Sequence, residues 1–135
     1  MKSPPESALV RAVLAAYGAM PGVMLWRNNV GAARTADGRM VRFGQPGAAD
    51  ILGVVKRTLE VRTVVNPDGF QPHESLRRET VGQAIAIECK ARGKKQSAAQ
   101  RVWQAAFEAM GGVYVLAEKL SDAADGLQEL FKENR

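Results

Sequence analysis

The sequence predicts an α/β fold in which a central mixed β-sheet is flanked by helices. Apolar residues recur at helical spacing near both ends of the chain, and short apolar runs rich in Val, Ile and Ala lie between them. A length of 135 residues suits one core of ordinary size and is short for two. We therefore expect a single domain over residues 1–135.

The first expected element is a helix over residues 3–18. Ser3 is a candidate N-cap and Pro4 suits the first helical position. The apolar residues that follow recur at helical spacing up to Gly18, namely Leu9, Val10, Val13, Leu14 and Tyr17. This helix is expected to pack on the sheet.

Two short strands are expected next, over residues 24–28 and 39–43. The turn-forming pair Asp37-Gly38 precedes the second of them. We expect the two strands to pair as a hairpin.

Residues 50–55 and 81–91 are expected to form buried strands separated by an insert at about 56–80. The insert begins with the alternating run 59–65 and becomes polar from Asn66. It is expected to be an extended hairpin with a mobile polar tip.

The remaining elements are expected to be a helix over 97–110, a short strand over 113–117 and a helix over 121–132. The first of these helices has the clearest apolar spacing, and Gly111-Gly112 ends it. In the last helix, Leu127, Leu130 and Phe131 lie on one side.

The formal net charge of +5 favours a polyanionic partner, with nucleic acid preferred to a membrane. The sequence contains no apolar stretch of spanning length and no signal peptide, so we expect a cytoplasmic protein. One cysteine and one histidine exclude an internal disulfide and a cysteine-cluster zinc site, and disfavour histidine-based chemistry. Catalysis would therefore depend on carboxylates, Lys or Arg.

Glu88 and Lys90 project from the same face of the expected strand 81–91, because side chains alternate along a strand. Burying such charges is costly unless they are paired or bound to an ion. The alternative is a simple ion pair at a strand end, which solvent would largely screen.

Asp50 begins the other buried strand, so two carboxylates can converge at neighbouring strands. They would repel each other unless a divalent cation neutralised them, and an oxygen-rich site suits Mg²⁺ or Mn²⁺. The alternative for Asp50 is a turn residue of the Asx type before a strand.

Four short motifs occur together in a distinctive order. They are Gly47-x-x-Asp50, Ile87-Glu88-Cys89-Lys90, the basic loop Arg92-Gly93-Lys94-Lys95, and Ser97-x-x-Gln100. From Glu6 to about Leu120 the chain resembles the VRR-NUC (virus-type replication-repair nuclease) branch of the PD-(D/E)XK nucleases. Two features depart from that pattern: Ala49 stands where Pro or Ser is usual, and the insert is unusually long.

The resemblance implies a restriction-endonuclease-like fold and a metal site made by Asp50, Glu88 and the backbone carbonyl of Cys89. Lys90 would hold the attacking water or stabilise charge at the phosphate. Its carboxylate neighbours should favour the protonated amine, so without bound metal Lys90 would be a poor general base, and the positioning and charge-stabilising role is preferred. Glu6 and Gln100 are implied as further site residues. Both also fit capping boxes, as Ser3-x-x-Glu6 and Ser97-x-x-Gln100, that need no catalytic role.

Several polar and basic residues are candidate DNA contacts, with a solvated basic surface as the alternative. They are Arg27, Asn28, Asn29, Arg34, Arg39, Arg42, Lys94 and Lys95. The tryptophans Trp26 and Trp103 are expected in the core rather than against bases. His73 is expected at the surface, and Cys89 is expected to face the core and to be inert.

The predicted function is Mg²⁺- or Mn²⁺-dependent hydrolysis of DNA phosphodiester bonds. One alternative is a binding module of the same fold without cleavage, and another is a basic structural or interaction protein. The resemblance further implies a homodimer acting on branched, Holliday-junction-like DNA in DNA repair, in a bacterial, phage or prophage context. The last helix, with Leu127, Leu130 and Phe131, and the run 59–65 are the candidate dimer contacts, and the alternative is that both simply pack within the chain.

Overall fold

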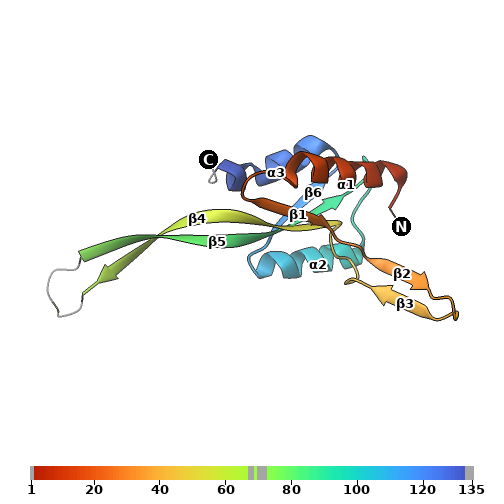
Figure 1. The fold of residues 1–135 in the computed structure, drawn as a ribbon, viewed down its shortest axis with the longest axis horizontal. Helices are drawn as coiled ribbons and strands as arrows, with labels where there is room; N and C mark the ends of the chain where they lie inside the picture. Colours follow the sequence, from red (N-terminus) through yellow and green to blue (C-terminus); the bar gives the residue numbers. More distant parts are fainter. Residues whose placement is uncertain (1, 67–68, 70–72, 133–135) are drawn as a thin grey trace.

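The computed structural model describes residues 2–66, 69 and 73–132 (Figure 1). The elements follow in the order α1 (Pro4–Tyr17), β1 (Val23–Arg27), β2 (Gly31–Arg34), β3 (Met40–Phe43), β4 (Ile51–Val65), β5 (His73–Cys89), α2 (Ala98–Ala109), β6 (Val113–Ala117) and α3 (Leu120–Lys132). None of the helices in this part of the chain is both long and apolar enough to cross a membrane.

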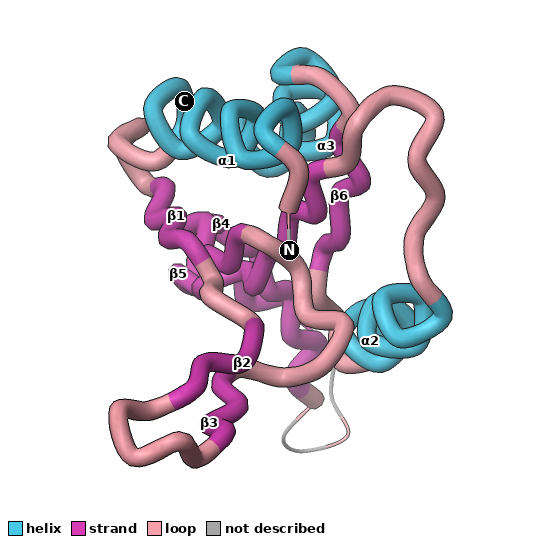
Figure 2. Tube along the Cα trace, turned by 90° about the vertical axis from the view of Figure 1, so that its right-hand side faces the viewer, coloured by secondary structure: helices cyan, strands magenta, loops and turns pink. Residues whose placement is uncertain are grey.

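The central sheet is mixed, as the sequence predicts. Its strand order is β1-β4-β5-β6, in which β4 pairs antiparallel with both β1 and β5 while β6 runs parallel to β5. The helices α1 and α3 cover one face of the sheet and α2 lies against the other (Figures 1 and 2). The predicted arrangement of a mixed sheet flanked by helices is confirmed.

The core lies between the sheet and the α1–α3 layer. Its buried residues include Val10 and Val13 from α1, Ile51 and Ile87 from the central strands, and Leu127 from α3. Leu130 is also buried, at 6% exposure. The prediction that α3 offers Leu127 and Leu130 as dimer contacts is therefore wrong, because the chain's own core uses both. The side chain of Phe131, named with them, lies outside what the structure describes.

The predicted pairing of residues 24–28 with 39–43 is also wrong. β3 pairs with β2 in a separate two-stranded sheet, and β1 pairs with β4. The run Gly31-Ala32-Ala33-Arg34 is short and has low strand propensity, so β2 was absent from the prediction. It nevertheless lies directly before the Asp37-Gly38 turn and is the nearest partner for β3.

The insert at 56–80 is a continuation of the two central strands. β4 has 15 residues and β5 has 17, and their pairing runs unbroken from Ile51↔Ile87 to Val65↔His73. Beyond the core the pair projects as a two-stranded ribbon (Figure 1). The extended hairpin is confirmed, whereas the predicted mobile tip includes residues 67–68 and 70–72, which lie outside the described residues.

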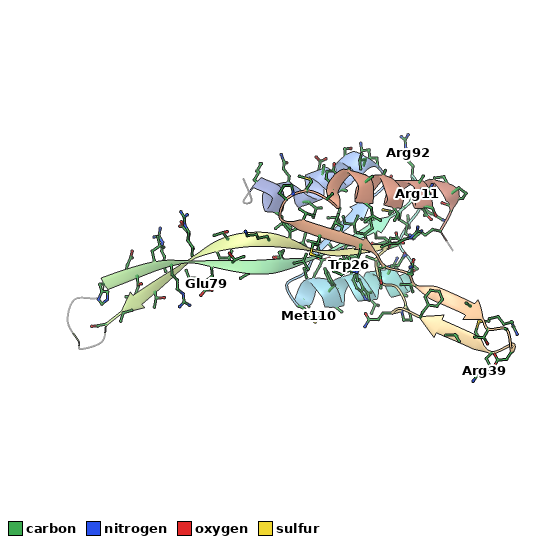
Figure 3. All side chains as sticks on the ribbon, in the orientation of Figure 1. Arg11, Trp26, Arg39, Glu79, Arg92 and Met110 are labelled. Carbon is green, nitrogen blue, oxygen red and sulfur yellow. The ribbon has the colours of Figure 1, made fainter. Side chains whose placement is uncertain are left out.

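The face of the sheet that α2 covers remains partly open. Trp26 is 46% exposed and Met24 is 67% exposed, so the prediction that Trp26 lies in the core is wrong. The cause is that β1 and β6 are opposite edges of the sheet and α2 packs against β6, so it leaves the β1 edge uncovered (Figure 2). Figure 3 labels Trp26 on this edge and Met110 at the end of α2. Trp103 is partly buried and stacks on Phe107, with ring centroids 4.9 Å apart.

Candidate metal centre

The adjacent ends of β4 and β5 bring Asp50 and Glu88 together. Ile51 pairs with Ile87, so the residue before β4 lies beside the last residues of β5. Asp50 Oδ2 accepts a hydrogen bond of 2.8 Å from the Cys89 backbone N–H. The predicted convergence of the two carboxylates is therefore present in the structure.

Glu88 is fully buried, at 0% exposure, although it carries a carboxylate. Its Oε1 accepts hydrogen bonds from Gln100 Nε2 at 2.7 Å and from Lys2 Nζ at 2.5 Å. Its Oε2 is buried and has no hydrogen-bond partner among the described residues. Burial raises the Glu88 pKa, and the hydrogen bond from Lys2 opposes that effect without cancelling it.

Lys90 follows directly after β5, and its backbone N–H donates to the Ala117 carbonyl at 2.9 Å. This bond to the end of β6 fixes the direction in which the side chain leaves the strand. Lys90 Nζ lies 3.6 Å from Glu88 Oε1, and the side chain is only 10% exposed. The predicted Glu-x-Lys pair is thus a buried charge pair at the mouth of the site.

Lys2 is a site residue that the sequence reasoning missed. Its Nζ lies 2.9 Å from Asp50 Oδ2 and donates to the Cys89 carbonyl at 2.8 Å, in addition to its bond to Glu88. Burial alone would lower the Lys2 pKa, but the two carboxylates outweigh it and raise the pKa. Lys2 belongs to no motif, and its only sequence signal was its position within one helical turn of Glu6.

Glu6 joins the start of α1 to the end of β5. Its Oε2 accepts from the Ser3 N–H at 3.0 Å, and its Oε1 accepts from the Ala91 N–H at 3.1 Å. Burial alone would raise the Glu6 pKa, but these N–H groups outweigh it and lower the pKa to about 2. Glu6 therefore lies at the site as predicted, while its carboxylate is held by backbone groups and by Lys94 at 3.7 Å.

Gln100 combines the two roles that the sequence left as alternatives. Its Oε1 accepts from the Ser97 N–H at 2.8 Å, and the Ser97 side chain accepts from the Gln100 N–H, which completes a capping box at the start of α2. The other end of the same amide donates to Glu88. The cap therefore orients the amide toward the buried carboxylate.

The segment before Asp50 is held from two sides. The Asn28 side chain donates to the Ala49 carbonyl at 3.0 Å, and the Asn28 backbone N–H donates to the Asp50 carbonyl at 2.7 Å. On the other side, Gly47 lies against the first turn of α2. Asn28, predicted as a DNA contact, thus uses its amide partly to position the loop.

A pocket of about 810 Å³ opens over these groups. It is lined by Lys2, Glu6, Ser7, Arg27, Asn28, Asn29, Val30, Phe43, Gly47, Ala48, Asp50, Lys90, Lys94, Lys95, Ser97 and Gln100. Five of these residues are basic and two are acidic, so the mouth favours an anion while the carboxylates beneath it favour a cation.

The predicted DNA-contact residues divide into two groups. Arg27, Asn28, Asn29, Lys94 and Lys95 line the pocket. Three arginines, Arg34, Arg39 and Arg42, lie instead on the exposed β2–β3 hairpin, where Figure 3 shows Arg39 at the far end from the sheet. The structure therefore brings the first group together at the pocket, whereas the three arginines lie on the β2–β3 hairpin beside it.

Two further predictions concern residues outside this chemistry. Cys89 faces the core, as predicted, and burial raises the pKa of its thiol to about 12, which disfavours the reactive thiolate. His73 is exposed at the start of β5, as predicted.

The chain matches no known protein-family model, no curated protein and no solved structure. Within the described residues, no group of three or more His, Cys, Asp and Glu side chains is placed to hold a metal ion. The candidate centre therefore consists of two carboxylates and one backbone carbonyl, and its interpretation depends on this local chemistry alone.

Proposed function

We propose that the chain is a Mg²⁺- or Mn²⁺-dependent DNA endonuclease with a PD-(D/E)XK-type active site. The main support is that three oxygen ligands converge on one positively charged atom. Oxygens of the Asp50 and Glu88 carboxylates and of the Cys89 carbonyl all lie within 2.9 Å of Lys2 Nζ. Lys90 stands beside them. The arrangement agrees with the ligand set that the resemblance to VRR-NUC nucleases implies.

The donor set fits a hard divalent cation. Mg²⁺ and Mn²⁺ take oxygen ligands, keep several waters and need few protein ligands. Glu88 Oε2 is buried without a partner in the described part of the chain, which is costly unless a cation or water binds it. Asp50, Glu88 and the Cys89 carbonyl would hold the ion.

The bound ion would supply Lewis-acid polarisation of the phosphate and acidification of a water. Lys90 stabilises negative charge developing on the phosphate, because its ammonium lies at the same opening as the carboxylates. Gln100 fixes the orientation of Glu88 through its 2.7 Å hydrogen bond. Glu6 positions α1 and the segment after β5, and does not act as an acid or base.

The basic mouth of the pocket supports a nucleic-acid substrate. Arg27, Lys94 and Lys95 line the opening and can contact phosphates on either side of the scissile bond. The β2–β3 hairpin, with Arg34, Arg39 and Arg42, extends this basic surface away from the sheet (Figure 1). We propose that the hairpin contacts the DNA backbone beyond the cut.

We further propose that the chain acts as a homodimer on branched DNA. One active site cuts one strand, so symmetric cutting of a four-way junction needs two copies related by a twofold axis. With α3 committed to the core, the run 59–65 on the ribbon is the remaining predicted contact. Val64 in this run is 64% exposed, and Leu76 on the neighbouring strand, on the same face of the ribbon, is 56% exposed.

The first experiment is an incubation of the purified protein with linear duplex, single-stranded and four-way-junction DNA, in Mg²⁺, Mn²⁺ or EDTA. Cleavage is expected with either metal and not with EDTA. Asp50→Ala, Glu88→Ala and Lys90→Ala should each lower the cleavage rate by at least about 100-fold, because each removes a ligand or a charge that stabilises the transition state. Glu88→Gln, which keeps the side-chain volume, should do the same.

Asp125→Ala is the matched control, because it removes an exposed carboxylate on α3 and touches neither the pocket nor the ribbon. It should cut as well as the parent. Metal-dependent cutting that survives in all three active-site variants would show that the site is misassigned. Binding of DNA without cutting under any metal condition would instead assign the chain as a nucleic-acid-binding module.

A further inference from the structure

The Lys2 ammonium is held by the same three oxygens that would hold the metal ion. Its Nζ lies 2.5 Å from Glu88 Oε1, 2.9 Å from Asp50 Oδ2 and 2.8 Å from the Cys89 carbonyl oxygen. Asp50 directly precedes β4, and Glu88 and Cys89 end β5, whereas Lys2 comes from the segment before α1. An ammonium and a divalent ion cannot occupy one set of oxygens together.

The main chain next to Lys2 is fastened to the site. Ser3, the N-cap of α1, donates its N–H to Glu6, and the other oxygen of Glu6 accepts from the Ala91 N–H just beyond β5. The start of α1 is thereby tied to the strand that carries Glu88. Of the described residues, Lys2 alone precedes this attachment, and its side chain is 21% exposed.

The energetics favour an occupied site. Two carboxylates that share a partly buried site repel each other, and removal of Glu88 from water is costly without a compensating charge. Lys2 supplies that charge in the absence of metal. Its long side chain can also return to solvent while Glu6 keeps the start of α1 in place, because only the lysine rotamers need to change.

We propose that Lys2 is a built-in competitor for the divalent cation, which closes the metal site until the ion displaces its ammonium. This inference rests on the proposed function, since it takes Asp50, Glu88 and the Cys89 carbonyl as metal ligands. Only molecules whose site is open can bind the metal. The apparent metal affinity is therefore the intrinsic affinity multiplied by the fraction of molecules in which the site is open. Metal loading and release of Lys2 are therefore one coupled event.

The first test is a titration of Mn²⁺ alone into the folded protein, followed by isothermal calorimetry. Lys2→Met keeps the length of the side chain and removes its charge. This variant should bind Mn²⁺ at least about tenfold more tightly than the parent. A factor of that size is expected when the parent's site is open in a tenth of molecules or fewer. Lys119→Met makes the same charge change at an exposed position before α3 and should leave the affinity unchanged.

The second test uses the parent protein, so it does not depend on how a variant folds. Lysine acylation mapped by mass spectrometry should label Lys2 slowly without metal and faster once Mn²⁺ is present. The exposed Lys119 is the internal reference and should react at the same rate in both conditions. A metal-dependent gain confined to Lys2 would show that the ion displaces its ammonium.

The outcomes separate this inference from the proposed function. If Mn²⁺ binds the parent and Lys2→Met equally, or if metal leaves the Lys2 labelling rate unchanged, the competitor role is overturned while the metal site stands. If Mn²⁺ binds neither protein, the metal site itself fails and the competitor role fails with it. Tighter binding in both Lys2→Met and Lys119→Met would mean that net charge explains the effect, and would also overturn the inference.

Discussion

Gly47 lies so close to the first turn of α2 that a Cβ added to it would be 2.3 Å from the Ala99 carbonyl oxygen. Its φ of +79° is also in the left-handed region that favours glycine. This contact fixes the loop that leads into β4 against the helix that carries Gln100. The glycine of the Gly47-x-x-Asp50 motif therefore sets the distance between the two halves of the candidate site.

Replacement of Gly47 by Ala should destabilise the fold and impair the site. The left-handed backbone costs about 1–2 kcal/mol for a non-glycine residue, and the contact with Ala99 adds to that cost. Gly38→Ala is the matched control, because Gly38 has a φ of +85° but no atom within 4 Å of an added Cβ. Urea unfolding should show a clearly larger loss for Gly47→Ala, and equal losses would contradict the proposed close approach.

Gln100→Ala should lower the DNA cleavage rate by about 10- to 100-fold, the usual effect of removing a group that orients a metal ligand. The variant also loses its capping-box partner, which should cost about 1 kcal/mol of stability. Gln104→Ala is the control: this residue lies on the same helix and bonds to Gln96 and Glu108. Comparable loss of activity in both variants would mean that helix stability, and not the Glu88 contact, causes the effect.

Glu6 should make stability depend on acid pH. Its folded pKa of about 2 is below the ordinary value of 4.5, so the ionised group stabilises the fold above pH 4.5 and loses this effect as pH falls toward 2. The difference in unfolding free energy between the parent and Glu6→Gln should reach up to about 3 kcal/mol at neutral pH and shrink with acid. Chemical denaturation from pH 2 to pH 7 would measure it, with the exposed Glu118→Gln as control. A difference that is constant with pH would argue against the charged cap.

Millimolar Mg²⁺ or Mn²⁺ should raise the thermal unfolding temperature of the parent, because the ion binds the folded state alone. Asp50→Asn should weaken that rise, since it removes one of the two carboxylate ligands. Asp37→Asn, in the exposed turn between β2 and β3, should respond to metal as the parent does. Scanning calorimetry that showed no metal response in any of the three proteins would count against a carboxylate metal site.

Light scattering at micromolar concentration should give the mass of a dimer. Combined replacement of Val64 and Leu76 by Lys places charges on one exposed face of the ribbon and should shift the protein toward monomer. Val102→Lys is the control, because Val102 is 71% exposed on α2. A parent protein that is strictly monomeric and still cuts four-way junctions symmetrically would defeat the dimer proposal. Equal cutting of linear duplex and junction would remove only the claim about substrate shape.

Local patterns in the sequence predicted most elements of the fold. The alternation of Ile85, Ile87 and Cys89 identified the core face of β5, and the patterns Ser3-x-x-Glu6 and Ser97-x-x-Gln100 predicted the starts of two helices. The partner of β3 was predicted wrongly because strand pairing depends on tertiary packing. The sequence of β2 has a weak strand propensity and did not indicate that β2 pairs with β3.

The sequence predicted the site residues that lie at strand ends. It missed Lys2, which comes from another part of the fold. Asp50, Glu88 and Lys90 could be placed together because neighbouring strands share a register. Lys2 could not, since its position depends on how α1 lies across the sheet. Trp26 was misplaced for a similar reason: burial on the second face depends on how far α2 extends over β1, which no local pattern encodes.

The unbroken ladder between β4 and β5 connects the far end of the ribbon to the candidate site. Its 15 paired positions run from Val65↔His73 to Ile51↔Ile87, a reach of about 46 Å at about 3.3 Å per step. That length exceeds one turn of B-form duplex, which is about 34–36 Å. The far end of the ribbon is therefore joined through continuous backbone pairing to the strand ends next to the two carboxylates, and amide exchange along the ladder would measure the free energy of opening each pair.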